Sequence, residues 1–258
     1  MKPADALFPD LLTLHGLLRE RGLWHALAYG TLLGAVRDGD LIPWDDDLDF
    51  LARPEDAPAL LALALEPHGL SIQAIHYPAR ALAVRPRGLR RFDAAVLRVL
   101  RGKRKVADFF LFTRFNDGVA RRYDLNAEVY WSPHSSFPSY FMERTVEVSL
   151  RGQPFPAPIH PERWLEIVYG QGWRVPRRSR ALGGLSQRGR NIYGHRVAPH
   201  VRRDLTWCRK QGWDRPEPGL PEWPRLVRGA GPIGPTPRTE GNSRALWWRD
   251  IDELVRFY

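Results

Sequence analysis

The sequence has one cysteine and no long apolar run, and both absences limit what the protein can be. Because Cys208 is alone, the chain can form neither an intrachain disulfide nor a zinc site made of cysteines. No apolar stretch approaches the roughly 20 residues that a membrane-spanning helix requires. The first residues also lack the basic and then apolar pattern of a secretory signal peptide. We therefore expect a cytoplasmic protein.

Lysine is rare as well, although the chain is strongly basic. Only 4 of the 39 basic residues are Lys, and the net charge is +10. Arg binds phosphate groups bidentately, so its excess suits a nucleotide or a polyanionic acceptor. A genome-wide bias toward Arg codons is the simpler explanation for most of these residues. Because the charge is spread along the chain without the interleaved aromatic residues of single-strand binders, we expect no dedicated nucleic-acid binding.

An acidic cluster set among apolar residues is the most informative segment. Its four carboxylates fall within five positions and belong to Asp45, Asp46, Asp47 and Asp49. Since side chains alternate along a strand, Asp47 and Asp49 point the same way. Two carboxylates held this close repel each other, which indicates a bound divalent cation, Mg²⁺ (or Mn²⁺). Asp45 shares that face, and a structural hydrogen bond is expected for Asp46. A capped turn or a solvated acidic loop is the alternative for the cluster.

A glycine turn precedes this cluster. Gly30 and Thr31 end an apolar, strand-like run, so bare backbone N–H groups there could approach a phosphate. Arg37 lies beyond the turn and either clamps a phosphate or forms a salt bridge to Asp38 or Asp40. Together with the acidic cluster, the turn predicts a metal-dependent phosphoryl- or nucleotidyl-transfer site.

These segments resemble the signature of the LicD family, a branch of the nucleotidyltransferase-fold superfamily. The family includes bacterial phosphocholine transferases and fukutin-related ribitol-phosphate transferases. The resemblance rests on residues 30–37, Gly-Thr-Leu-Leu-Gly-Ala-Val-Arg, and on residues 42–49, Ile-Pro-Trp-Asp-Asp-Asp-Leu-Asp. It implies that Asp47, Asp49 and a third carboxylate, Asp108, form a catalytic metal site. Asp108 is also placed to act as base toward an acceptor hydroxyl, although the Pro that usually follows the third carboxylate is missing.

A further segment, residues 165–176, resembles the family's Tyr-Gly-Asp-x-Trp-x-x-Pro, with Gln171 in place of the usual Asp. By this resemblance Tyr169 and Trp173 line an acceptor or base pocket. An aromatic residue beside a glycine turn is as often part of the core, and that alternative stays open for both.

The resemblance implies a metal-dependent transferase of cell-surface glycan modification. It would move phosphocholine or a polyol phosphate from a CDP-linked donor to a hydroxyl of a glycan or a small molecule. An ordinary nucleotidyltransferase that attaches NMP to a small molecule uses the same three carboxylates and is the first alternative. Outside enzymes, the alternatives are a scaffold on the same fold or a nucleic-acid-binding module.

Hydrophobic periodicity predicts an α/β (α+β) fold, with a mixed sheet flanked by helices and a C-terminal extension. Expected helices cover residues 4–20, 54–66 and 161–169, with a helical turn at 31–36. Expected strands cover residues 24–29, 48–52, 81–85, 94–100, 106–112, 123–131 and 145–150. The lack of regular βαβ repeats argues against a Rossmann fold.

Composition divides the chain into three parts. We expect a catalytic domain over residues 1–210, a Pro- and Gly-rich linker over 211–242 and an amphipathic helix over 243–258. The terminal helix either docks on the catalytic domain or, through its Trp-rich face, touches a partner or the inner membrane face.

Overall fold

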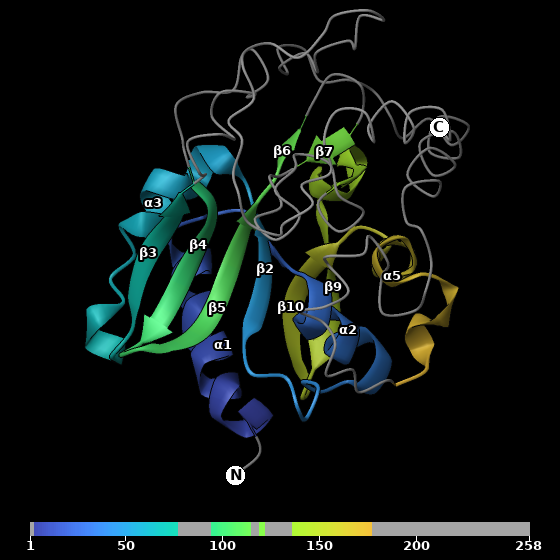
Figure 1. Ribbon diagram of the computed structural model, residues 1–258, viewed down its shortest axis with the longest axis horizontal. Coiled ribbons are helices and arrows are strands. Elements are labelled where there is room, and N and C mark those ends of the chain that lie inside the picture. Colours follow the sequence, from blue (N-terminus) through green and yellow to red (C-terminus); the bar gives the residue numbers. More distant parts are fainter. Residues whose placement is uncertain (1–2, 77–93, 115–118, 122–135, 177–258) are drawn as a thin grey trace, which may run out of the picture.

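The computed structural model describes residues 3–76, 94–114, 119–121 and 136–176. Figure 1 shows how they are arranged around a central sheet. The strands expected at 81–85 and 123–131, the linker and the terminal helix lie outside the described residues. Among the residues that are described, no helix is both long and apolar enough to cross a lipid bilayer.

The central sheet has five strands in the order β1-β2-β5-β4-β3. They are β1 (His25–Leu27), β2 (Leu48–Ala52), β3 (Ser71–His76), β4 (Ala94–Arg101) and β5 (Arg104–Leu111). β2 pairs with β5 in parallel, and the other neighbours pair antiparallel. Most of β2 and the middle of β5 are buried, which is typical of strands that are covered on both faces.

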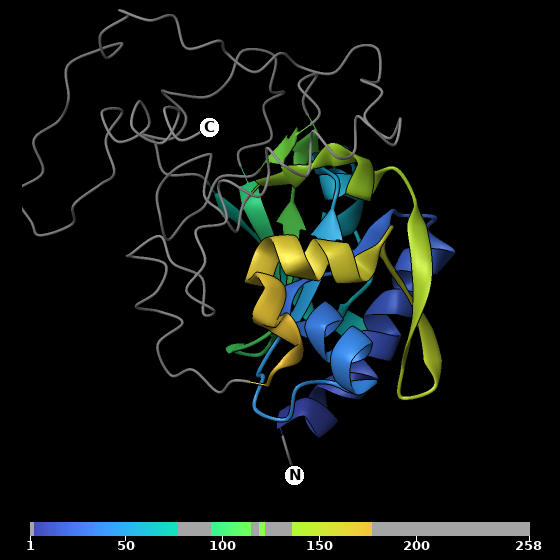
Figure 2. The ribbon, with the colours of Figure 1, turned by 90° about the vertical axis from the view of Figure 1, so that its right-hand side faces the viewer.

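Helix α1 (Pro3–Glu20) covers one face of this sheet (Figures 1 and 2). The leucines that predicted it share one helix face and are at most 1% exposed: Leu7, Leu11, Leu14 and Leu18. This helix confirms the expectation for residues 4–20. Burial of four leucines on one stripe gives α1 most of its stability, because helices in proteins are stabilised mainly by the packing of their apolar face.

Helix α2 (Tyr29–Asp38) follows β1 directly and packs against β2 and against helix α5 (Pro161–Tyr169). Figure 2 shows α2 and α5 together on one side of the molecule. The hairpin of β9 (Thr145–Leu150) and β10 (Gln153–Pro158) places β10 beside β1. A second small sheet contains β6 (Thr113–Arg114), β7 (Val119–Arg121) and β8 (Ser136–Pro138).

Short 3₁₀ helices complete the fold: η1 (Pro54–Asp56), η2 (Glu66–His68), η3 (Ser139–Met142) and η4 (Gln171–Arg174). The single helix expected at 54–66 is therefore wrong, because only α3 (Ala57–Leu61) between η1 and η2 is α-helical. The chain leaves α3 at Ala62 and buries both Leu63 and Leu65.

The sequence analysis missed strands β3 and β10, and also the short strands β6, β7 and β8 of the small sheet. β10 contains three prolines, at positions 154, 156 and 158, and proline is uncommon in strands, so its sequence did not indicate a strand. Proline lacks a backbone N–H and is tolerated on edge strands, and both strands of a two-stranded hairpin are edges.

Candidate active site

The site is built around the sharp turn that joins β1 to α2. Tyr29 has a positive φ of 38° at this turn, and Gly30 and Thr31 begin the helix. Three hydrogen bonds connect the turn to Asp49 of β2. The Ala28 N–H donates to the Asp49 carbonyl oxygen (2.9 Å), and the Asp49 N–H donates to Thr31 Oγ1 (2.9 Å). The Gly30 N–H donates to Asp49 Oδ2 (3.0 Å).

This arrangement gives Gly30 and Thr31 a role that the sequence did not predict, because both position Asp49. Thr31 is only 1% exposed, and its hydroxyl accepts a hydrogen bond from the backbone of β2. A Cβ atom on residue 30 would overlap Oδ2 of Asp45 and would lie 3.4 Å from Oδ2 of Asp49. Glycine is therefore required where the turn approaches the carboxylates. The contact of these two residues with a phosphate stays a prediction.

The loop before β2 brings Asp45, Asp46 and Asp47 together, and we call it the acidic loop. Asp45, Asp46 and Asp47 each offer a carboxylate oxygen, and these oxygens lie within 4.8 Å of one another. A backbone hydrogen bond from the Asp45 N–H to the Ile42 carbonyl oxygen (3.0 Å) closes the turn that brings them together. Carboxylate oxygens are the ligands that Mg²⁺ and Mn²⁺ prefer, so this group fits such an ion. Asp46 belongs to the group, although the sequence assigned it only a structural hydrogen bond.

Asp108 lies in register with Asp49, on the parallel neighbouring strand β5. Asp108 is 4% exposed, and its side chain is held by Arg98, which faces it from the antiparallel strand β4. Arg98 Nε donates to Oδ1 (2.8 Å), and its Nη2 donates to Oδ2 (2.9 Å). This bidentate ion pair fixes the carboxylate of Asp108 at the sheet surface.

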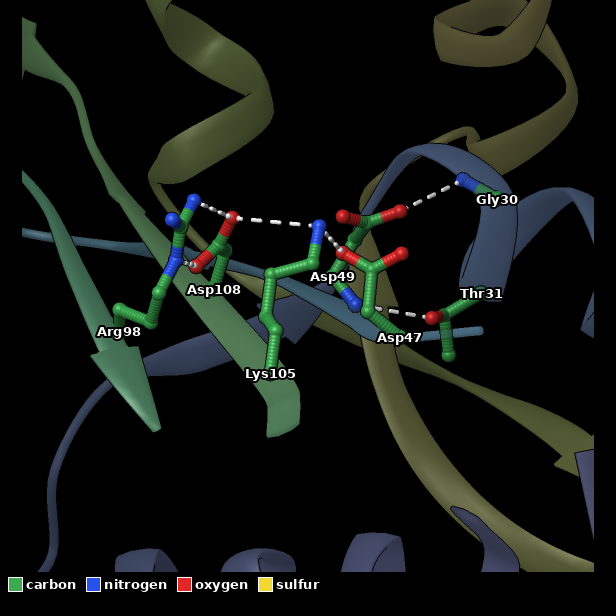
Figure 3. A network of polar contacts seen from close by, with 7 residues as sticks. All are labelled: Gly30, Thr31, Asp47, Asp49, Arg98, Lys105 and Asp108. Carbon is green, nitrogen blue, oxygen red and sulfur yellow. Dashed lines mark hydrogen bonds and ion pairs between the residues drawn. The ribbon is translucent and has the colours of Figure 1, made fainter. Parts of the chain in front are cut away.

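Lys105 connects Asp47 of the acidic loop with Asp108 of β5. Its Nζ lies 2.6 Å from Oδ2 of Asp47 and 3.9 Å from Oδ2 of Asp108. Figure 3 shows the ammonium group between these carboxylates, with Arg98 on the other side of Asp108. The sequence analysis missed both Arg98 and Lys105. The available signal was a charged residue within the apolar strand Ala94–Arg101 and a lysine three residues before Asp108.

The acidic loop forms an acidic centre together with Asp49 and Asp108. In this centre, burial and neighbouring charges raise the pKa values of Asp45, Asp47 and Asp49. Burial, and next the charge of Asp47, raises the pKa of Asp45 to about 7. Burial together with the charges of Asp47 and Asp45 raises the pKa of Asp49 well above its usual range. Burial raises the pKa of Asp47 too, although the charge and hydrogen bond of Lys105 act to lower it. A divalent cation would reverse this balance by stabilising the ionised forms.

The remaining predicted residues lie in other surroundings. Arg37 forms an ion pair with Asp38 (2.7 Å), which is the alternative to a phosphate clamp that the sequence left open. Trp173 is 2% exposed, and the guanidinium of Arg174 lies 4.2 Å from its ring. Tyr169 is partly buried against the core. The substrate-binding roles of Arg37, Tyr169 and Trp173 stay predictions.

The mixed sheet, the glycine turn and the carboxylates on adjacent strands are typical of a nucleotidyltransferase-like fold. Residues 22–160 match the family model described as LicD/FKTN/FKRP, nucleotidyltransferase domain. Because the match covers more than half of the chain, this protein belongs to that family. The resemblance seen in the sequence and the expected α/β fold class are thereby confirmed.

Comparison with curated proteins finds no match. Among solved structures, the chain is similar to the lincomycin-bound crystal structure of the lincosamide antibiotic adenylyltransferase LnuA. The two share 13% sequence identity with a TM-score of 0.40, over 61% of this chain and 83% of LnuA.

Proposed function

We propose that this protein transfers a phospho-alcohol group, such as phosphocholine or a polyol phosphate, from a CDP-linked donor to a hydroxyl of a glycan or a related small molecule. Membership of the LicD family supports a transferase. The observation that carries the proposal is the acidic centre, in which Asp49 and Asp108 lie in register beside the acidic loop. Phosphoryl transfer needs positioned carboxylates and charge compensation at one place, and this centre supplies both.

The acidic centre would hold Mg²⁺ or Mn²⁺ through Asp47, Asp49 and Asp108, with Asp45 and Asp46 adding oxygen ligands beside them. When bound, the ion would neutralise charge on the diphosphate of the donor. Gly30 and Thr31 support this arrangement because they fix the backbone and carboxylate of Asp49. In the same centre Arg98 holds the carboxylate of Asp108 in a fixed position.

The transfer step balances without any further reactant. The acceptor oxygen attacks the β-phosphorus of the donor and forms a new P–O bond. The bond between the β-phosphorus and the bridging oxygen breaks, and CMP leaves with that oxygen. We assign Asp108 as the group that accepts the proton of the acceptor hydroxyl, since it is a carboxylate that Arg98 holds within the centre.

Nucleotidyl transfer is the second candidate, because the description of the matching family names a nucleotidyltransferase domain. In that reaction the acceptor attacks the α-phosphorus of a nucleoside triphosphate and pyrophosphate leaves. The two reactions use the same carboxylates and differ in the phosphorus that is attacked.

Isothermal titration tests the proposal. CDP-choline, CDP-ribitol, CTP and ATP are titrated into the protein with Mg²⁺ and with EDTA. The same series is run on Asp47→Ala/Asp49→Ala and on the matched control Glu147→Ala, an exposed acid on β9. Metal-dependent binding of a CDP-alcohol that is lost only in the double variant supports the proposal. Preference for a triphosphate favours nucleotidyl transfer, and binding of none of the four argues against both.

A further inference from the structure

Among the residues that the structure describes, Lys105 is the one cation of the acidic centre that the proposed reaction leaves without a role. Its Nζ contacts Asp47 at 2.6 Å and Asp108 at 3.9 Å, so a single ammonium group faces carboxylates from two separate segments (Figure 3). A divalent ion held by Asp47 and Asp108 would use the same two carboxylates. The ammonium group and a divalent ion are therefore competitors for this position.

We propose that Lys105 is a built-in competitor of the metal and a contact for the donor phosphate. Its ammonium group neutralises Asp47 and Asp108 until a divalent ion binds these carboxylates, and it then moves onto the phosphate of the donor. This inference rests on the proposed function, since it takes a metal and a nucleotide-linked phosphate as the ligands of the same site.

The position of Lys105 allows such a movement. The side chain is 37% exposed and belongs to the second residue of β5, close to the turn that joins β4 and β5. Lysine carries its charge on a flexible four-carbon stem with three N–H donors, and it forms point-charge contacts that do not depend on one fixed orientation. It can therefore exchange a carboxylate for a phosphate oxygen without moving the strand.

Arg98 shows the opposite behaviour within the same centre. Its guanidinium group makes two hydrogen bonds, of 2.8 Å and 2.9 Å, to the two oxygens of Asp108. The planar guanidinium group pairs with both oxygens of one carboxylate, so the contact depends on one fixed orientation. Arg98 and Asp108 also face each other in the register of the sheet. Arg98 thus fixes Asp108 permanently, which leaves Lys105 as the exchangeable cation.

If Lys105 competes with the metal, its replacement should change metal binding and phosphate binding in opposite directions. Replacing Lys105 by Met removes a positive charge next to the metal ligands, so the metal should bind about tenfold tighter, comparable to the shift that one neighbouring charge causes in an Asp pKa. The same variant loses a donor to phosphate, so pyrophosphate should bind several-fold more weakly in the presence of metal. If Lys105 were merely structural, its replacement would weaken the binding of both the metal and pyrophosphate.

Titration of Mn²⁺ alone tests the first effect without any assumption about the donor. The proteins are wild type, Lys105→Met, the charge-preserving Lys105→Arg and the matched control Lys103→Met, which removes an exposed lysine of the same hairpin. Tighter Mn²⁺ binding in Lys105→Met alone is expected. Equal or weaker binding in that variant overturns the inference while the proposed function stands. Absence of Mn²⁺ binding in all four proteins contradicts the proposed function itself.

Lysine acylation followed by mass spectrometry tests the movement in the wild-type protein, so the result does not depend on the folding of a variant. The reactivity of Lys105 should rise on addition of Mg²⁺ and fall again when inorganic pyrophosphate is added, whereas that of Lys103 should stay constant. Reactivity of Lys105 that does not respond to Mg²⁺ would overturn the proposal.

Discussion

Asp49 and Asp108 lie directly opposite each other on the parallel strands β2 and β5. Side chains in register on neighbouring strands project from the same face, and the strands are about 4.8 Å apart. The two carboxylates therefore share one site although they belong to distant parts of the sequence. The acidic loop before β2 adds its carboxylates to the same place, and the whole arrangement depends on the register of the sheet.

The hydroxyl of Thr31 should be needed to hold β2 in position. In Thr31→Val the backbone N–H of Asp49 loses its buried acceptor, so we expect a loss of about 1–3 kcal/mol in the free energy of unfolding. Denaturant unfolding measures it. Thr13→Val is the matched control, since the Thr13 hydroxyl donates to Pro9 on the exposed surface of α1. An equally small loss in both variants would show that the Thr31 hydrogen bond contributes nothing specific.

Gly30→Ala should weaken metal binding more than it weakens the fold. The added Cβ displaces the carboxylate of Asp45, whose oxygen it would overlap, and so disturbs the acidic loop. Titration with Mn²⁺ should show a clear loss of affinity. Gly16→Ala in α1 is the control, because a Cβ there meets nothing within 4 Å and should stabilise the helix by about 0.5–1 kcal/mol. Unchanged Mn²⁺ affinity in Gly30→Ala would contradict the assigned geometry.

Removal of Arg98 should destabilise the protein through Asp108. Arg98→Met leaves the Asp108 side chain, which is 6% exposed, without its bidentate partner. Breaking a fully buried pair costs about 3–5 kcal/mol, and we expect about 3 kcal/mol or less because the Arg98 side chain is 34% exposed. Arg174→Met removes an exposed pair with Glu162 and should cost less than about 1 kcal/mol. Equal unfolding free energies for the two variants would refute this prediction.

His25 should make the stability of the protein depend on pH. Its Nδ1 donates to the Leu23 carbonyl oxygen (2.9 Å), so its Nε2 accepts a hydrogen bond from Nδ1 of His15 (2.9 Å). Burial is the main cause that lowers the pKa of His25 from 6.5 to about 4. Between these values the unfolded chain binds a proton that the folded protein does not. The contribution of His25 is therefore complete above about pH 6.5, and up to about 3 kcal/mol is lost as the pH falls to about 4.

Urea unfolding of the wild type and of His25→Gln at several pH values between 4 and 7 measures this contribution. The variant should be less stable at pH 7 and should lose less stability on acidification than the wild type. The same slope in both proteins would mean that another group is responsible.

Patterns within a few neighbouring residues correctly predicted several helices and strands. Strand 48–52, strand 145–150 and helix 161–169 have the predicted bounds in the structure. Their alternation, apolar periodicity and a proline in the first helical turn are all visible within a few residues. The acidic loop was visible for the same reason, because its carboxylates are consecutive in the sequence.

Contacts that depend on register could not be predicted in this way. The partner of Asp108 is Arg98 only because β4 pairs with β5 in one particular register, and that register includes an irregularity between Val99 and Leu100. Lys105 reaches Asp47 because β5 lies beside β2, which no local pattern specifies. The role of Thr31 also depends on a long-range contact, between α2 and β2.

Product analysis tests the central claim most directly. The protein is incubated with a CDP-alcohol, Mg²⁺ and a hydroxyl-bearing glycan acceptor, and separately with CTP or ATP and the same acceptor. Nucleotide and phosphate products are separated by chromatography and identified by ³¹P NMR. We predict metal-dependent release of CMP together with a phosphodiester on the acceptor, both abolished in Asp47→Ala/Asp49→Ala. Release of pyrophosphate from a triphosphate, with no CMP from any CDP-alcohol, would contradict the proposal.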